Sequence, residues 1–410
     1  MASVENGTTI SNKDKIVSRI RRIKPSETLA ITNKAKAMKA EGIDVVSFAA
    51  GEPDFDTPDY IKEAAIDALN RGETKYTPVP GIKELKEAIS RMILCNNNLE
   101  YSPEEIIVSI GAKHSIYNIC QVLIEEGDEV IIHSPYWVSY PSMVELAGGT
   151  PVILSCSEEN GFQFDVDDLK KKISNKTKAF ILNSPCNPTG AVFSEELLRQ
   201  VAEVAVEREL LVISDEIYDN IRFMDSPPKS IATFGNDIRR LTLYVNGVSK
   251  SYSMTGWRIG YTAGDPVIIQ EMSKLQSQST SNPVSFAQWG ATEALMGPQQ
   301  LVFEHCETFR KRRDLMVEGL NSIEGFYCIQ PQGTFYVFPN VSSLVGKSYN
   351  GKKVTGTAEL AELLLEKAKV VVIPGGGFGA EDHFRISFAT TMEMIEKGLD
   401  RMREFVSRLD

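Results

Sequence analysis

The feature that most constrains the fold is a pattern that repeats from about Ser102 to Gly264: a short apolar run, a polar turn and a segment of helix length. Five runs carry the pattern, EEIIVSI, DEVIIHS, KAFILNS, LLVISDE and LTLYVNG. Runs rich in valine, isoleucine and leucine, spaced by helix-length segments, are typical of buried strands in a mostly parallel sheet. The pattern therefore predicts an α/β domain.

Each of the five runs is followed by residues that can do chemistry. In chain order these are Gly111, Ala112 and Lys113; Tyr136 and Trp137; Asn183 and Asn187; Asp215 and Tyr218; and Lys250. In open α/β sheets, ligands bind outside the carboxyl ends of the strands. We therefore expect these residues to converge on a single site.

The texture of the sequence changes after about Gly290. A charged helical pattern, FEHCETFRKRRDLMVEGLNSI, is followed by the strand-like pieces GTFYVFP, VVVIP and HFRISFA, the last of which contains Arg385. A chain of 410 residues is long enough for two domains, each with its own core. We predict a second, smaller α+β domain here.

Composition excludes several classes of function. The net charge of -11 argues against a general nucleic-acid binder. No apolar run reaches the roughly 18 residues that a membrane helix needs. Six scattered cysteines without a CxxC pair suit a reducing compartment, and four histidines without ligand spacing predict no metal site. The first thirty residues lack a signal-peptide core, so we expect a cytoplasmic protein.

One stretch contains basic residues and no acid. Between Ile238 and Gly264 the chain has no Asp or Glu, and its cations are Arg239, Arg240, Lys250 and Arg258. The stretch is either a solvated basic loop or a site for an anionic ligand that supplies the missing charge.

A second candidate for anion binding is the turn in IIVSIGAKHSIYN, where a strand leads into a helix. Free backbone N–H groups at Gly111, Ala112 and Lys113 would suit an anion at the start of that helix. Such a turn is more often merely structural, and it gains weight because Arg258 also requires a negative partner.

Three polar or aromatic residues in the other turns are further candidates, and two of them have a structural alternative. Asp215 at the end of an apolar run is a helix N-cap, or a carboxylate that shares a pocket with Tyr218. Asn187 lies in a loop made rigid by prolines, where it could present its amide in a fixed direction. Trp137 is a core residue or a flat platform for a ring.

These parts together suit pyridoxal 5'-phosphate. The sequence resembles the fold type I aminotransferases of class I, and among them the bacterial-type aspartate aminotransferases that include prephenate aminotransferases. The resemblance covers nearly the whole chain. It is carried by IKPSETLAI, AAGEPDFDTP, KYTPVPG, GAKHSIYN, SPYWVSYP, NSPCNPTGAVF, SDEIYDN, SKSYSMTGWRIGY and FRISFAT.

The resemblance implies a fold and a domain arrangement. The fold is the type I fold of pyridoxal-phosphate-dependent transferases, with a large domain around a mostly parallel sheet and a smaller α+β domain. We place an N-terminal arm at residues 1–27, the small domain at 28–58 and 300–410, and the large cofactor-binding domain at 59–299. The family also implies a homodimer with shared active sites.

The resemblance also implies roles for individual residues. Lys250 is similar to the lysine that binds the cofactor and moves the proton, Asp215 to the partner of the pyridine nitrogen, and Tyr218 and Asn187 to the partners of the ring oxygen. Trp137 would stack on the ring. The phosphate would be held by Arg258, by the backbone at Gly111, Ala112 and Lys113, and by Tyr76 of a second subunit. The substrate's α-carboxylate would meet Arg385, with Gly51, Trp137 and Asn187 nearby, and Lys113 and Thr28 would lie beside its side chain.

The implied activity is ping-pong transfer of an amino group between L-aspartate and 2-oxoglutarate, with prephenate as a further acceptor. Two positions depart from the family: Ser184 and Cys186 flank Pro185 where an Asn-Pro pair is common, and Tyr140 replaces the histidine of the animal-type enzymes. Because Asn187 is kept, we expect cofactor binding to survive. The alternatives are an aromatic or diaminopimelate aminotransferase, or a non-catalytic ligand sensor of the same fold.

Overall fold

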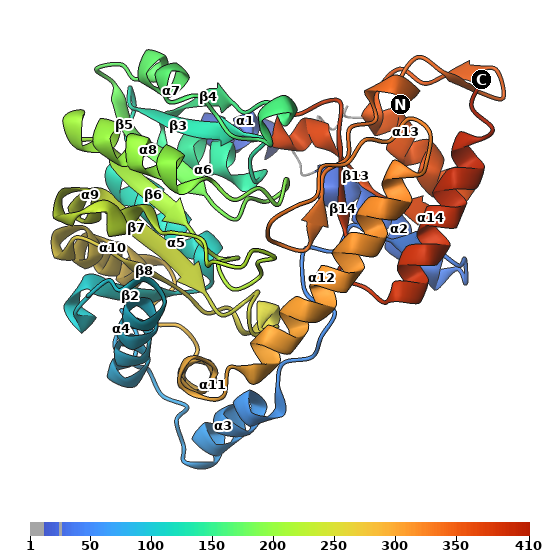
Figure 1. Cartoon of the computed structure of the whole chain (residues 1–410). Coiled ribbons are helices and arrows are strands. Elements are labelled where there is room, and N and C mark those ends of the chain that lie inside the picture. The colour runs from blue at the N-terminus through green and yellow to red at the C-terminus, as the bar shows by residue number, and fades with distance from the viewer. Residues whose placement is uncertain (1–11, 24–26) are drawn as a thin grey trace, which may run out of the picture.

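The computed structural model describes residues 12–23 and 27–410, without the side chains of residues 13–14 and 27–30. Its centre is a seven-stranded sheet with the order β2-β8-β7-β6-β5-β3-β4 (Figure 1). The strands are β2 (Ile106–Ser109), β3 (Glu129–Ser134), β4 (Thr150–Ser155), β5 (Thr177–Asn183), β6 (Leu211–Asp215), β7 (Thr242–Gly247) and β8 (Gly260–Ala263). Strand β8 is antiparallel to β2 and β7, whereas β3 to β7 pair in parallel. The five predicted runs are all strands, and the mostly parallel sheet is confirmed.

The sheet is buried on both faces, as its apolar runs predict. In β3, Val130 and Ile132 belong to one apolar cluster, and Ile131 between them belongs to another on the opposite face. Helices α5 (Ala112–Leu123), α6 (Ser139–Ala147) and α10 (Pro266–Ser279) cover the first face, and α7 (Val166–Lys172), α8 (Glu195–Glu207) and α9 (Asn236–Leu241) cover the second. Helices α3 (Asp59–Asn70), α4 (Lys83–Asn97) and α11 (Ser285–Met296) pack beside β2 and β8.

A smaller group of elements lies beside the large sheet (Figure 1). It contains the antiparallel sheet β13-β14-β9, formed by Ile373–Pro374, Phe384–Ser387 and Tyr336–Val337, and the parallel pair β1 (Val46–Ser47) and β12 (Val370–Val371). Helices α2 (Glu27–Ala40), α13 (Thr357–Leu363) and α14 (Met392–Val406) surround them, with a hairpin of β10 (Ser348–Tyr349) and β11 (Lys352–Lys353). Helix α12 (Gln300–Asn321) runs from one group to the other. We propose residues 59 and 300, where α3 and α12 begin, as the domain boundaries.

The segment from Gly51 to Thr57, which we call the strap, connects the two groups near α12. Its Asp54 forms a bidentate ion pair with Arg312 of α12, with distances of 2.6 and 3.0 Å. Beside that pair, the ring of Phe55 stacks on His305 with centroids 3.9 Å apart. Further along, Thr57 Oγ1 donates to the Ser253 carbonyl and accepts from Trp257 Nε1. The strap is thereby attached both to α12 and to the loop that follows Lys250.

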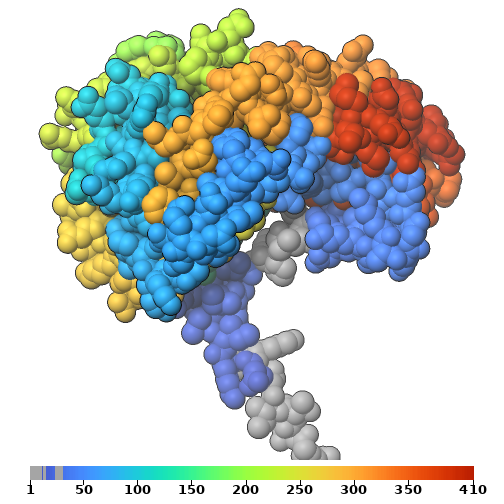
Figure 2. All heavy atoms as spheres, turned by 90° about the horizontal axis from the view of Figure 1, so that it is seen from below, coloured from blue at the N-terminus to red at the C-terminus, as the bar shows by residue number. Residues whose placement is uncertain are grey.

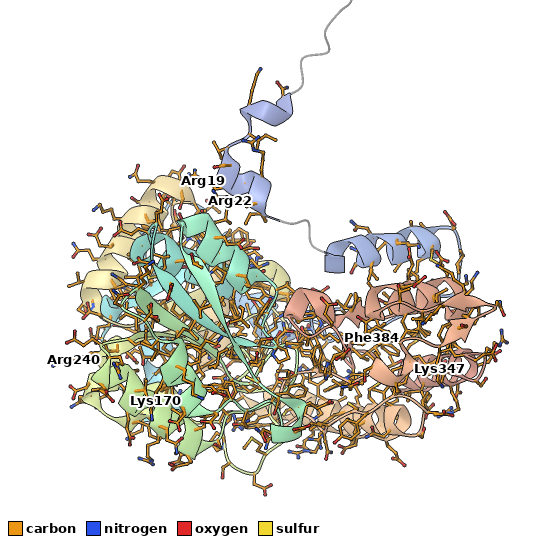
Figure 3. All side chains as sticks on the ribbon, turned by 90° about the horizontal axis from the view of Figure 1, so that it is seen from above. Arg19, Arg22, Lys170, Arg240, Lys347 and Phe384 are labelled. Carbon is orange, nitrogen blue, oxygen red and sulfur yellow. The ribbon has the colours of Figure 1, made fainter. Side chains whose placement is uncertain are left out.

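The described part of the N-terminal arm stands out from the body of the molecule (Figures 2 and 3). It includes α1 (Ser18–Arg22), which contacts α6 and buries none of its residues. Arg19 and Arg22 lie on this projection. Over the ranges that the structure describes, we find no helix with both the length and the apolarity needed to cross a membrane.

Candidate functional site

The predicted residues do converge at the carboxyl ends of the parallel strands. A cavity of about 310 Å³ lies there. Its lining includes Gly51, Ala112, Lys113, Trp137, Asn187, Asp215, Tyr218, Lys250, Arg258 and Arg385. Most of these follow β2, β3, β5, β6 and β7, whereas Gly51 and Arg385 come from the smaller group of elements. The cavity is therefore formed where the two groups meet.

Positive charge exceeds negative charge in this cavity. Its lining contains four cations, Lys113, Lys250, Arg258 and Arg385, and a single carboxylate, that of Asp215. Within the described chain, none of the four forms an ion pair with a carboxylate. By contrast, Arg239 from the same acid-free stretch pairs with Glu105 at 2.8 Å. The acid-free stretch thus supplies two cations to a site that can accept an anionic ligand.

The amine of Lys250 is held in a partly buried position at the end of β7. Its Nζ donates to the Gly51 carbonyl of the strap and lies 5.8 Å from the ring centroid of Tyr218. Burial, followed by the positive charge of Arg385, lowers the pKa of Lys250 to about 8. A lysine with such a pKa has a substantial fraction of free amine near neutral pH and can act as a nucleophile and a base.

Asp215 is buried at the end of β6, and its carboxylate has defined partners. Oδ2 accepts a hydrogen bond of 2.6 Å from the phenol of Tyr140, and Oδ1 accepts one of 3.3 Å from the N–H of Ile217. Burial raises the pKa of Asp215 to about 6, although the bond from Tyr140 works in the opposite direction. A turn follows Asp215, so the helix-cap interpretation does not hold.

The start of α5 and Arg258 form a cationic cradle. The backbone N–H groups of Ala112 and Lys113 have no partner among the described residues. The Gly111 N–H, by contrast, donates to the Ser109 carbonyl at 2.8 Å, so our prediction that it would be free is wrong. The contribution of Gly111 is steric: its φ is +82°, and a Cβ there would lie 2.9 Å from Cζ of Arg258. Only glycine permits this approach.

Arg385 is buried on β14 without a charged partner. Its Nη1 donates to Asn187 Oδ1 at 3.4 Å and its Nη2 to the Ala49 carbonyl at 3.2 Å. The single N–H on Nε is buried and has no partner. The guanidinium lies 4.6 Å from the ring centroid of Tyr336. A buried arginine that lines a cavity without a carboxylate partner indicates a place for an anionic group.

Aromatic residues complete the cavity. The Nζ of Lys113 lies over the ring of Trp137, 4.7 Å from its centroid. Burial, followed by the charge of Arg258, lowers the pKa of Lys113. The hydroxyls of Tyr218 and Tyr336 are 3.2 Å apart and share a hydrogen bond. Their rings close the side of the cavity next to Lys250.

Three of the predicted residues, Gly111, Tyr136 and Tyr76, are not part of this lining, and a fourth, Thr28, is only partly described. Tyr76 is 91% exposed and does not line the cavity of its own chain. Thr28 belongs to α2, but its side chain lies outside the described residues.

Other residues in the cavity were not predicted as part of it. Tyr140 forms a hydrogen bond with Asp215, and Tyr336 forms one with Tyr218. Thr255, which also lines the cavity, donates to Glu52 Oε2 at 2.8 Å. The sequence contained one indication that Tyr140 belongs to the site, because Tyr140 lies three residues after Trp137 at the start of a helix. The sequence contained no such indication for Tyr336, because Tyr336 contacts Tyr218, which is 118 residues away in the chain.

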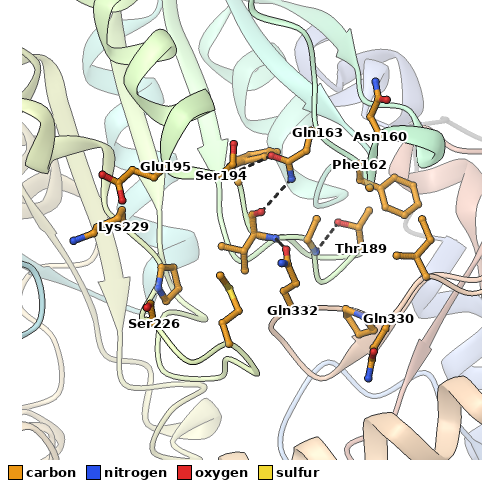
Figure 4. A pocket seen from close by; sticks show the side chains of 18 of the residues that line it. Asn160, Phe162, Gln163, Thr189, Ser194, Glu195, Ser226, Lys229, Gln330 and Gln332 are labelled. Carbon is orange, nitrogen blue, oxygen red and sulfur yellow. Dashed lines mark hydrogen bonds between the residues drawn. The ribbon is translucent and has the colours of Figure 1, made fainter.

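A larger cavity of about 900 Å³ lies behind the loop that presents Asn187 (Figure 4). Two of its carboxamides are already bonded to the loop: Gln163 Nε2 donates to the Val192 carbonyl, and Gln332 Oε1 accepts from the Val192 N–H. Its charged lining residues are Glu195 and Lys229, which lie together at one side. This cavity has neither the excess charge nor the nucleophile of the smaller one, so we assign the chemistry to the smaller one.

Comparisons with known proteins agree with this geometry. The family model for aminotransferase class I and II matches residues 43–402. An aspartate aminotransferase of Bacillus sp. strain YM-2 is 48% identical over 96% of this chain and 100% of its own length. An aspartate/prephenate aminotransferase of Cereibacter sphaeroides is 46% identical over 95% of this chain and 98% of its own length.

Solved structures give the same result. The aspartate aminotransferase of Rhizobium meliloti has a TM-score of 0.93 at 42% identity, over 96% of this chain and 99% of that one. The enzyme from Thermus thermophilus with maleate has a TM-score of 0.90 at 41% identity, over 95% of this chain and 99% of that one. The fold is therefore the type I fold expected from the sequence.

The environment of Lys250 makes a prediction about its titration. In the cofactor-free protein, with its lysines reductively methylated with 13C-formaldehyde, the Lys250 amine should titrate near pH 8 by NMR instead of near 10.5. That signal should be missing from Lys250→Ala. It should move to higher pH in Arg385→Gln, because the arginine's charge disfavours the protonated amine. A Lys250 amine that titrates with the surface lysines would contradict the assignment.

Proposed function

The chain belongs to the class I and II aminotransferases, and from this premise we propose that it is an aspartate aminotransferase that depends on pyridoxal 5'-phosphate. The reaction moves the amino group between L-aspartate and 2-oxoglutarate by a ping-pong mechanism. The observation that carries the proposal is the cavity with four cations and one carboxylate around the partly neutral amine of Lys250. A phosphate and a dicarboxylic acid would supply the missing negative charges.

The residues of the cavity suit pyridoxal phosphate. Arg258 and the unpaired N–H groups of Ala112 and Lys113 would hold the phosphate. Asp215 would bond the pyridine nitrogen, Tyr218 and Asn187 the ring oxygen, and Lys250 the aldehyde carbon. The ring of Trp137 would lie against the pyridine. When bound, the cofactor supplies a protonated ring that accepts the electron pair left on the substrate's Cα.

The chain's own residues then control protons. Above pH 8 the Lys250 amine is mostly neutral and can take the proton from the substrate's Cα and deliver it elsewhere. Asp215, with a pKa of about 6, is ionised at neutral pH and can keep the pyridine nitrogen protonated. Tyr140 holds its carboxylate in place with the bond of 2.6 Å.

The substrate would be held at both ends. Arg385 has no carboxylate partner and would hold the α-carboxylate through its guanidinium, beside Gly51 and Asn187. Lys113 has no ion pair in the described chain and would reach the second carboxylate from above Trp137; we keep Thr28 as its proposed neighbour. The Thermus thermophilus structure with maleate, a dicarboxylate, supports a site of this kind. We propose prephenate as a further acceptor, because the Cereibacter sphaeroides relative is named for both substrates.

We also propose that the protein works as a homodimer in the cytoplasm. Six unpaired cysteines suit a reducing compartment. The exposed phenol of Tyr76 lies outside its own cavity and would complete the phosphate site of a second copy. Exposed apolar side chains of α3, Ile66 and Leu69, lie near it in sequence and would be covered by such a contact.

The activity itself is tested with Lys250→Ala. With L-aspartate and 2-oxoglutarate, the wild-type protein should form oxaloacetate, measured by coupling to malate dehydrogenase. The variant should lose at least roughly a thousandfold in kcat, because both nucleophile and base are removed. It should still bind pyridoxal phosphate reversibly by dialysis, through Arg258 and Asp215. Turnover by the variant close to the wild-type value would show that Lys250 has another role.

Specificity for dicarboxylates is tested with Lys113→Ala. In this variant the KM for aspartate and glutamate should be about tenfold higher than in wild type, or more, and the KM for alanine or phenylalanine should change little. Only the dicarboxylates lose a charge-assisted hydrogen bond. Steady-state kinetics with the four amino acids measure the difference. An equal loss for all four would mean that Lys113 serves the cofactor or the fold.

The shared site is tested by hybrid dimers. Tyr76→Phe and Lys250→Ala proteins, each impaired alone, should regain part of the activity when mixed and allowed to exchange subunits, because one of the hybrid's two sites is intact. Sedimentation under assay conditions measures the assembly. A fully active monomer, or mixtures no more active than the sum of their components, would contradict a shared site.

A further inference from the structure

One buried titratable side chain near the site has no role in the account above. His133 is 1% exposed at the end of β3 and does not line the cavity. It lies among aromatic rings, with centroids 5.0 Å from Phe193 and 6.5 Å from Phe180, both in edge-on geometry. An apolar side chain would fill this space without the cost of burying two ring nitrogens. A polar residue here therefore requires an explanation.

The explanation lies in the way the sheet ends. Strand β5 pairs with β3 only as far as Ile181 opposite Ile132, whereas on its other side it pairs with β6 as far as Asn183 opposite Asp215. The backbone N–H of Asn183 consequently has no strand partner on the β3 side. It donates to Nε2 of His133 at 3.2 Å. The imidazole thus takes the place of a missing backbone acceptor at the last residue of β5.

The side chain of Asn183 connects this backbone bond to the residues of the site. Its Nδ2 donates to the Asp215 carbonyl at 2.9 Å, and its Oδ1 accepts from the Asn187 N–H at 2.9 Å. Asn187 Oδ1 in turn accepts from Nη1 of Arg385 at 3.4 Å. All four residues from His133 to Arg385 are at most 5% exposed. A continuous series of hydrogen bonds therefore joins the imidazole to the guanidinium that faces the cavity.

We propose that His133 is a positioning residue for the substrate-binding arginine. Its Nε2 fixes the backbone of Asn183, which orients Asn187 and, through Asn187, Arg385. The proposal rests on the proposed function, in which Arg385 holds the substrate's α-carboxylate. His133 does not touch substrate or cofactor.

The protonation state of the imidazole agrees with this role. Nε2 can accept from Asn183 only when it carries no proton, so the ring must be neutral with its proton on Nδ1. Burial lowers the pKa of His133 to about 4, opposed by a hydrogen bond to the backbone of Pro135, which can offer only its carbonyl. The ring is therefore neutral over the range in which the enzyme would work.

The loop that carries Asn187 has a second support on its other side. Behind it, Gln163 and Gln332 bond the backbone of Val192 (Figure 4). These contacts hold the far end of the loop at Val192, nine residues beyond Asn183 in the chain. Within the loop, the Cys186 N–H donates to the Ala191 carbonyl and the Gly190 N–H to the Cys186 carbonyl, whereas the Asn187 N–H itself is bonded by Asn183.

The test compares His133→Leu, which keeps the volume but removes the acceptor, with His133→Gln, whose amide oxygen can reach the Asn183 N–H. Leu198→Ala, a buried change in α8 outside this series of bonds, is the control for general loss of stability. Four quantities are measured on each protein loaded with pyridoxal phosphate: the Kd for maleate, the KM and kcat for aspartate, and the midpoint of urea unfolding.

We expect His133→Leu to weaken maleate binding and raise the KM for aspartate about tenfold, with a smaller change in kcat. The reason is that the variant loses the hydrogen bond that helps to orient Arg385, which would bind the substrate's carboxylate. His133→Gln should stay within about threefold of wild type. Leu198→Ala should lower the urea midpoint without changing the Kd for maleate. If His133→Leu does not fold, His133→Asn replaces it. The shorter asparagine side chain cannot reach the Asn183 N–H, so we expect the same weakening of maleate binding.

Two results would overturn the proposal: wild-type maleate binding in His133→Leu or His133→Asn, or equal losses in the leucine and glutamine variants. A wild-type protein that binds pyridoxal phosphate but does not transaminate aspartate would instead remove the proposed function on which this inference rests. The two failures are therefore distinguishable.

Discussion

The site depends on an imbalance of charge: four cations, Lys113, Lys250, Arg258 and Arg385, line one cavity with the carboxylate of Asp215 alone. Such a cavity is unfavourable until anions enter it, because like charges lie close together with little water between them. Arg385 adds to burial in lowering the pKa of Lys250, and Arg258 does the same for Lys113. The charge that would attract an anionic ligand thus adds to burial in making the lysine amine available for chemistry.

This arrangement explains why the site lies where the two groups of elements meet. The large sheet supplies Lys250, Asp215 and the start of α5, and the smaller group supplies Arg385. The strap fixes one relative to the other: its Gly51 carbonyl accepts from Lys250, and its Asp54 pairs with Arg312 of α12. Fold and site are therefore coupled, because movement of the strap would move the acceptor of the Lys250 amine.

The sequence predicted the strands and the residues that follow them, because apolar runs and polar turns are local signals. It missed β4 and the antiparallel β8, whose runs TPVILS and GYTA are shorter or less apolar. The prediction that the Gly111 N–H is free was wrong, because its hydrogen bond to the Ser109 carbonyl cannot be recognised from the residue types. Contacts such as Tyr218 with Tyr336 join distant segments, and only the folded chain reveals them.

The central claim is that Lys250 and its surrounding cations form a working pyridoxal phosphate site for dicarboxylic amino acids. The absorption spectrum of the purified protein loaded with pyridoxal phosphate tests it most directly, recorded before and after addition of L-aspartate alone. The account predicts that aspartate shifts the cofactor band to that of the amino form and that 2-oxoglutarate then restores it, with alanine far less effective at equal concentration. A spectrum of bound cofactor that aspartate leaves unchanged would contradict the account.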